Sequence, residues 1–172
     1  MWVKDYMCSW VNTISPEKTI AEAVKLMVEK RTNSLIVVDE SKKPIGLVSS
    51  HSLIRAVVPE YLRENEITSQ FNAEGAFDKH AQRNKDMIVK DVMYEDIHIL
   101  NVNDAMIEAA TYASKGARRV LPVADERGTL VGAITRTCIK LALYNAIFKD
   151  NQIDPGLMRR NGGKEDCGCG CS

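Results

Sequence analysis

Aromatic residues, regularly spaced cysteines and net charge are all scarce in this sequence of 172 residues. Aromatic side chains make up 6% of the residues, and lysine plus arginine equals aspartate plus glutamate at 23 each. A chain without net charge has no global field that would attract nucleic acid or an anionic membrane. We therefore expect neither as a partner, and a binding site for an anion has to be local.

Long apolar runs are absent as well. None approaches the roughly 20 residues of a membrane-spanning helix, and the N-terminal residues lack the apolar core of a signal peptide. Of five cysteines, Cys8 and Cys138 stand alone and the other three crowd together near the C-terminus, which is not a spaced disulfide framework. We expect a cytoplasmic protein in a reducing compartment.

Enzyme signatures are also missing. The sequence contains no nucleophile elbow, P-loop, dinucleotide-binding fingerprint or HExxH motif, and its three histidines form no spaced set of metal ligands. We predict a protein without catalytic activity and without a required cofactor.

What the sequence does contain is an internal repeat. Residues 35–49 match residues 121–135 at a fixed offset of 86 positions, and Val-Lys-Asp-x-Met occurs at 3–7 and again at 89–93. The offset holds without a gap over roughly fifty positions. A register that never slips indicates two copies of one structural unit.

The second copy shows its elements most clearly. Residues 120–124 and 130–134 are short apolar runs separated by turn residues, which is typical of two strands joined by a tight turn. Thr135 is then placed to cap a helix that we expect to end near Phe148. The apolar spacing predicts a core face made of Ile139, Ala142, Leu143, Ala146 and Ile147. By the same offset, a helix from about residue 50 to 58 follows the strands of the first copy.

The helix before the strands is predicted from its capping residues. Thr19 and Glu22 have the spacing of a capping box, in which each side chain bonds the backbone N–H of the other. In the second copy we expect Asp104 to be the N-cap. The predicted core face of the first of these helices is Ile20, Ala23, Val24 and Met27.

These features predict a first repeat at 1–58, a connector at 59–86, a second repeat at 87–149 and a tail at 150–172. Polar residues and weak periodicity predict that the connector is a partly helical spacer, and the alternative is a lid or a partner-contact element. The tail has no apolar period, which predicts disorder.

With Val-Lys-Asp-x-Met, Leu-Pro-Val-x-Asp at 121–125 and Gly-x-Ile-Thr at 132–135, each repeat resembles the cystathionine-β-synthase (CBS) domain. The resemblance covers residues 1–58 and 87–148. It implies an α/β (α+β) fold, a tandem pair or Bateman module, with two β-α-β-β-α repeats packed through their sheets. It also implies a homodimer that binds AMP, ADP, ATP or S-adenosylmethionine in clefts between the repeats and regulates another, unknown protein.

The family's ligand motif is glycine, two hydrophobic residues and Ser or Thr, followed three positions later by aspartate. The resemblance places it on residues 46–52 and 132–138. The hydroxyl residue is present in both repeats, whereas the aspartate that grips the ribose in the family is replaced by Ser52 and Cys138. Loss of a charged acceptor is expected to weaken nucleoside binding by about one to two decades.

Three arginines favour the second repeat as the ligand site. Arg118 and Arg119 precede its first core strand, and Arg136 follows Thr135. Guanidinium groups at a helix N-terminus bind phosphate well, and the alternative is that all three are solvated surface residues. The predicted ligand-binding residues are Asn33, Ser49, Ser52, Arg118, Arg119, Pro122, Gly132, Thr135, Arg136 and Cys138.

The tail carries Cys167, Cys169 and Cys171 in a C-x-C-x-C pattern. We expect a solvated, oxidisable tail, and the alternative is a metal or redox role with these three cysteines as zinc ligands, because thiolates bind zinc and copper(I). Two other readings of the whole protein stay open: a ligand-free structural dimerisation module, and a metal- or thiol-handling protein.

Overall fold

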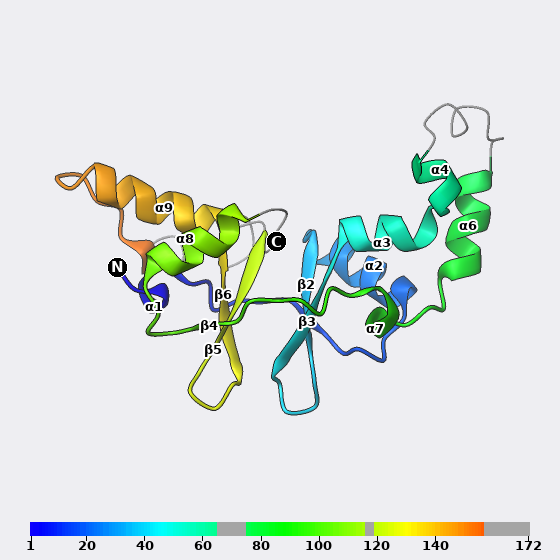
Figure 1. The fold of residues 1–172 in the computed structure, drawn as a ribbon, viewed down its shortest axis with the longest axis horizontal. Helices are drawn as coiled ribbons and strands as arrows, with labels where there is room; N and C mark the ends of the chain where they lie inside the picture. The colour runs from blue at the N-terminus through cyan, green and yellow to red at the C-terminus, as the bar shows by residue number, and fades with distance from the viewer. Residues whose placement is uncertain (65–74, 116–118, 157–172) are drawn as a thin grey trace.

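The computed structural model describes residues 1–64, 75–115 and 119–156, which form two β-α-β-β-α units as predicted. The first unit contains β1 (Thr13–Ile14), α2 (Ile20–Glu29), β2 (Ser34–Val38), β3 (Pro44–Ser49) and α3 (Ser50–Val57). The second contains β4 (Leu100–Asn101), α8 (Met106–Ser114), β5 (Val120–Ala124), β6 (Leu130–Thr135) and α9 (Arg136–Ile147). Figure 1 shows the two sheets next to each other at the centre, with α2 and α3 beside one and α8 and α9 beside the other.

Each unit has a three-stranded sheet whose middle strand, β2 or β5, pairs in parallel with one neighbour and antiparallel with the other. Successive side chains of a strand point to opposite faces. Leu35, Ile36 and Val37 are nevertheless all buried in β2, and Leu121 to Ala124 are all buried in β5. The middle strands are therefore covered on both faces, which explains their continuous apolar runs.

Each repeat of the sequence contributes a one-turn helix to the core of the other structural unit. α1 (Val3–Tyr6) belongs to the first repeat of the sequence, yet Val3 lies in the second unit's core with Leu100. α7 (Val89–Val92) belongs to the second repeat, yet Val89 lies in the first unit's core with Leu35. Both valines are completely buried. The two repeats are thus interlocked, and removing either one would open the core of the other.

The connector contains two helices within the described residues, α4 (Glu60–Glu64) and α6 (Ala76–Asn84). α6 packs against α3 of the first unit. Residues 65–74 of the connector lie outside the described ranges. The role of the connector, as a spacer or as a lid or partner-contact element, stays a prediction.

Two of the three predicted caps are confirmed. Thr19 and Glu22 form the capping box, with the Thr19 hydroxyl accepting from Glu22 N–H at 3.2 Å. Thr135 caps α9. The prediction for Asp104 was wrong, because its carboxylate accepts from Asn101 N–H at 2.6 Å and closes the preceding turn instead. Helix α8 begins at Met106, whose N–H donates to the backbone carbonyl of Met1.

The predicted core faces of two helices were partly wrong. In α2, Val24 is 42% exposed, and in α9, Leu143 is 55% and Ile147 is 69% exposed; Ala146 of α9 is exposed too. The buried residues of α9 are Cys138, Leu141, Ala142 and Asn145. Apolar side chains occupy more than one face of α9, so spacing alone did not identify the face that the sheet covers.

In the described part of the chain, no helix is long and apolar enough to cross a membrane. Residues 150–156 of the predicted tail are described, and Ile153 N–H donates to the Asn145 Oδ1 at 2.9 Å. The disorder predicted for the rest of the tail and the predicted zinc ligands Cys167, Cys169 and Cys171 fall on residues outside the described ranges.

Candidate ligand-binding site

The predicted ligand motifs lie at the two junctions where a sheet's last strand becomes a helix. β3 continues into α3 at Ser49, and β6 continues into α9 at Thr135. The Ser49 hydroxyl accepts from Ser52 N–H at 3.2 Å, and the Thr135 hydroxyl accepts from Cys138 N–H at 3.4 Å. Both hydroxyls therefore serve as N-caps, and each satisfies one free backbone donor of its helix.

The two residues in the family's aspartate position are both buried. The Ser52 hydroxyl donates to the Ser49 carbonyl at 2.8 Å and accepts from Ser49 N–H at 2.9 Å. The Cys138 sulfur lies 3.3 Å from the Thr135 hydroxyl oxygen and 3.6 Å from the Cys8 sulfur. The hydrogen bond with Cys8 and burial together raise the pKa of the Cys138 thiol well above its ordinary value. Neither position supplies a charged acceptor for ribose hydroxyls at neutral pH.

Arg119 and Arg136 come together at the same end of the second sheet. Val120 pairs with Thr135 across β5 and β6, which places Arg119 and Arg136 one residue beyond the paired ends. Both side chains are exposed, and within the described part of the chain neither has an ion-pair partner within 4.0 Å. Two free guanidinium groups therefore flank the N-terminus of α9. Arg118 lies outside the described ranges.

Pro122 and Gly132 are buried in the same sheet, one on β5 and the other on β6. A Cβ atom on Gly132 would lie 2.7 Å from the Cys8 backbone oxygen, which is too close for any side chain. Gly132 is therefore required by the N-terminal segment that crosses over β6, and its place in the ligand motif coincides with this packing role.

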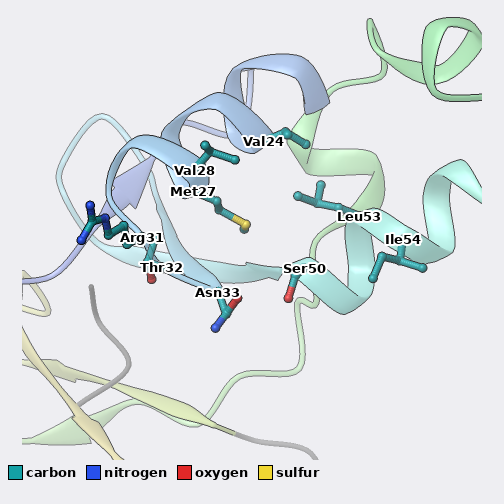
Figure 2. Close-up of a pocket in the computed structure, with 9 residues that line it drawn as sticks. All are labelled: Val24, Met27, Val28, Arg31, Thr32, Asn33, Ser50, Leu53 and Ile54. Carbon is teal, nitrogen blue, oxygen red and sulfur yellow. The ribbon is translucent and has the colours of Figure 1, made fainter. Parts of the chain in front are cut away.

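The first repeat has a pocket between α2 and α3, with a volume of about 460 Å³ (Figure 2). Met27 and Leu53 lie on facing sides of it, and Asn33 and Ser50 lie together at one edge. Ser50 N–H donates to the Asn33 carbonyl at 3.0 Å, which fixes this edge. The pocket is lined by Val24, Met27, Val28, Arg31, Thr32, Asn33, Ser50, Leu53 and Ile54.

Sequence reasoning identified Asn33 in this pocket but missed Arg31 and Thr32. Arg31 follows the end of α2 with a positive φ of 49°, a left-handed conformation that the sequence pattern does not reveal. Thr32 is buried, and its hydroxyl donates to the Ser34 carbonyl at 3.0 Å. The internal repeat could have pointed to Thr32. At the 86-residue offset, Thr32 and Asn33 of the first repeat correspond to Arg118 and Arg119 of the second, which were predicted to bind the ligand.

A contact between the repeats adds His51 and Tyr94 to the first junction. The His51 Nδ1 lies 3.0 Å from the Tyr94 hydroxyl oxygen, across the segment that follows α7. His51 is exposed. The equivalent positions at the second junction are Thr137 and Cys8, so the two junctions share a backbone but differ in their side-chain chemistry.

No group of three or more potential metal-ligating side chains is found among residues 1–64, 75–115 and 119–156. The predicted zinc ligands of the tail lie outside these ranges, and the zinc site stays a prediction.

Comparison with known proteins matches this architecture to one family. The family model described as "CBS domain" matches residues 3–59 and 89–145. The chain is 30% identical over 132 residues to the CBS domain-containing protein CBSX1, chloroplastic, of Arabidopsis thaliana. That match covers 73% of this chain and 56% of the plant protein, so the chain spans little more than half of that relative's length.

Solved structures show the same fold. The CBS-pair protein CBSX2 from Arabidopsis thaliana superposes with a TM-score of 0.70 at 23% identity, covering 87% of this chain and 97% of that one. A structure of CBSX2 in complex with AMP gives a TM-score of 0.62 at 24% identity and covers 85% of this chain and 98% of that one.

Proposed function

Because the chain belongs to the CBS domain family and carries two such domains, we propose that it is a regulatory module that senses an adenine nucleotide. AMP, ADP, ATP and S-adenosylmethionine are the ligands we consider, and the protein whose activity responds is not identified. The support from the comparisons is that CBSX2, a protein of the same fold, has been solved in complex with AMP. We further propose that the module itself is not an enzyme and that it acts in the cytoplasm.

The observation that carries the proposal is the position of Arg119 and Arg136 beside the start of α9. Strand pairing brings both guanidinium groups to one end of the sheet, where the backbone N–H groups of a twelve-residue helix also point. Guanidinium groups and a helix N-terminus both stabilise phosphate. We propose that Arg118, Arg119 and Arg136 hold the phosphate groups, while Thr135, Gly132, Pro122 and Cys138 shape the floor of the site.

The first junction offers a less charged site. Asn33, Ser49 and Ser52 are the predicted contacts, and Asn33 alone of these lines the pocket between α2 and α3. We propose that nucleotide binds more weakly here than at the second junction. At both junctions the absence of the ribose-binding aspartate is expected to reduce affinity by about one to two decades relative to relatives that retain it.

The experiment is thermal unfolding with AMP, ADP, ATP or S-adenosylmethionine, followed by calorimetric titration of any ligand that raises the melting temperature. A ligand at about 100 times its Kd stabilises the native state by roughly 2.7 kcal/mol, which is several degrees for a chain of this size. We expect the double variant Arg119→Ala, Arg136→Ala to lose most of this shift. Arg127→Ala is the matched control, because Arg127 is exposed in the turn at the far end of the same two strands.

If the ligand still raised the melting temperature of the Arg119→Ala, Arg136→Ala variant by the same amount, the proposed phosphate site at the second junction would be refuted. No shift with any of the four ligands would contradict nucleotide sensing itself.

The second candidate function is a structural dimerisation module. It is favoured by exposed apolar side chains on the outer helices of both units, away from the sheets. They are Val24 and Val28 on α2, Ile54 on α3, Ile107 on α8, and Leu143 and Ile147 on α9. We propose that these helices form a homodimer interface, with or without a nucleotide, because exposed apolar clusters mark association sites.

A further inference from the structure

We infer that Cys8 and Cys138 form a modification site, a reversible disulfide that ties the N-terminal segment to the start of α9. The two sulfur atoms lie 3.6 Å apart although the residues are 130 positions apart in the sequence. A disulfide bond is about 2.05 Å long, so the sulfurs have to approach by about 1.5 Å. Both residues are thiols in this structure, with no disulfide bond between them.

The backbones on both sides of this pair are already fixed. Cys8 N–H donates to the Ala133 carbonyl and Ala133 N–H donates to the Cys8 carbonyl, each at 2.9 Å. Cys138 lies in the first turn of α9, held by the Thr135 cap. The pairing of the two thiols thus follows from the strand contact and the helix start.

The first repeat shows that the architecture does not require a thiol at either position. At the 86-residue offset, Cys8 corresponds to Tyr94 and Cys138 corresponds to Ser52. Tyr94 makes the same backbone contact to the first sheet, through Leu47, that Cys8 makes to the second. The thiol pair is therefore a feature of one junction and not a consequence of the fold.

The two thiols differ in access. Cys8 is half-buried, whereas Cys138 is buried and is held in its protonated form by the hydrogen bond with Cys8 and by burial, which raise its pKa. The reaction therefore begins at Cys8, the less buried of the two residues.

The exchange proceeds in two balanced steps. The Cys8 thiolate attacks the external disulfide, forms a mixed disulfide and releases one external thiolate, which takes up a proton. Cys138 then loses its proton, its sulfur attacks the Cys8 sulfur, and the second external thiol leaves. Overall, two protein thiols are oxidised by two electrons, and one external disulfide is reduced to two thiols.

The test uses the full chain with Cys167, Cys169 and Cys171 changed to serine, which leaves Cys8 and Cys138 as the remaining cysteines. The protein is equilibrated under native conditions in mixtures of oxidised and reduced glutathione. We expect a mass loss of two hydrogen atoms, a peptide linking Cys8 to Cys138, and reversal by excess reduced glutathione. The oxidised form should melt roughly 5–15 °C higher, because the bond closes a loop of more than a hundred residues.

Cys8→Ser and Cys138→Ser, each in the same background, are the matched controls and should show neither the mass loss nor the rise in melting temperature. The inference is overturned if both thiols stay open to alkylation in oxidised glutathione, or if the product stops at a glutathione adduct on Cys8. It is also overturned if the link forms only in denaturant. None of these readouts depends on nucleotide binding.

Discussion

The backbones of Cys8 and Ala133 exchange two hydrogen bonds of 2.9 Å each, which join the first segment of the chain to the last strand of its second half. Leu47 and Tyr94 exchange an equivalent pair at 3.0 and 2.8 Å in the first half. Helices α1 and α7 also pack in the unit of the other repeat. Each structural unit therefore contains residues from both repeats of the sequence.

Val3→Ala is expected to loosen the second unit and not the first. Val3 is fully buried against Leu100 and other residues of that core, so its truncation should cost about 2 kcal/mol of unfolding free energy. Hydrogen exchange measured by mass spectrometry should accelerate in β4 to β6.

Val89→Ala is the matched control, since Val89 is equally buried but packs in the first unit. It should accelerate exchange in β1 to β3. If each variant loosened the unit of its own repeat instead, the crossed packing of α1 and α7 would be refuted.

Gly132→Ala should destabilise the protein more than Gly46→Ala. The new methyl group on residue 132 would meet the Cys8 backbone oxygen at 2.7 Å, and that segment is held by the hydrogen bonds to Ala133. We expect a loss of about 2–3 kcal/mol in urea unfolding.

At Gly46 the nearest atom is the Met93 sulfur at 2.6 Å, the end of a flexible side chain that can rotate away. A loss of about 1 kcal/mol is expected there. If the two variants lost the same free energy of unfolding, the backbone of Cys8 would yield to a new methyl group as easily as the Met93 side chain does.

The capping box of α2 predicts a pH dependence. Hydrogen bonds from Lys18 and from the Thr19 backbone lower the pKa of Glu22 below its ordinary value. A carboxyl group whose pKa is lower in the folded state stabilises the fold above its unfolded pKa, and this contribution disappears as the pH falls through the folded pKa. Glu22→Gln should therefore melt lower than wild type at pH 7, and the difference should shrink as the pH falls through the lowered pKa of Glu22 in the folded state.

Glu17→Gln is the control for this experiment, because Glu17 is exposed and lies just before the same helix. A melting difference for Glu22→Gln that stays constant from pH 7 to pH 3 would contradict an electrostatic origin.

Val28→Lys and Ile107→Lys are each expected to weaken the proposed homodimer by at least ~10-fold, because a charge would enter an apolar interface. Val28 on α2 is 72% exposed and Ile107 on α8 is 75% exposed, so neither change should unfold the protein. Sedimentation equilibrium measures the dissociation constants.

Phe77→Lys is the matched control, since Phe77 is 71% exposed but lies on the connector helix α6. If Phe77→Lys weakened the dimer as much as the other two, the interface would include the connector. A wild-type protein that stays monomeric at high concentration would remove the dimer proposal.

Much of the fold could be predicted from the sequence because its signals are local. The Thr19–Glu22 box and the Thr135 cap identify helix starts by the hydrogen bonds they make within one turn. The apolar runs of β2 and β5 and the fixed offset between the repeats identified two units with the same order of elements. Val24, Leu143 and Ile147 were misplaced, because spacing identifies an apolar face only where the other faces are polar.

The sequence by itself determined that there are two copies of a β-α-β-β-α unit, and where their strands and long helices lie. The tertiary structure alone decided which core receives Val3 and which receives Val89, since a short apolar segment fits either unit and its pattern contains no information about the partner. It also decided that Cys8 meets Cys138. These contacts join residues far apart in the sequence, and they arise when burial and strand pairing select one packing of the whole chain.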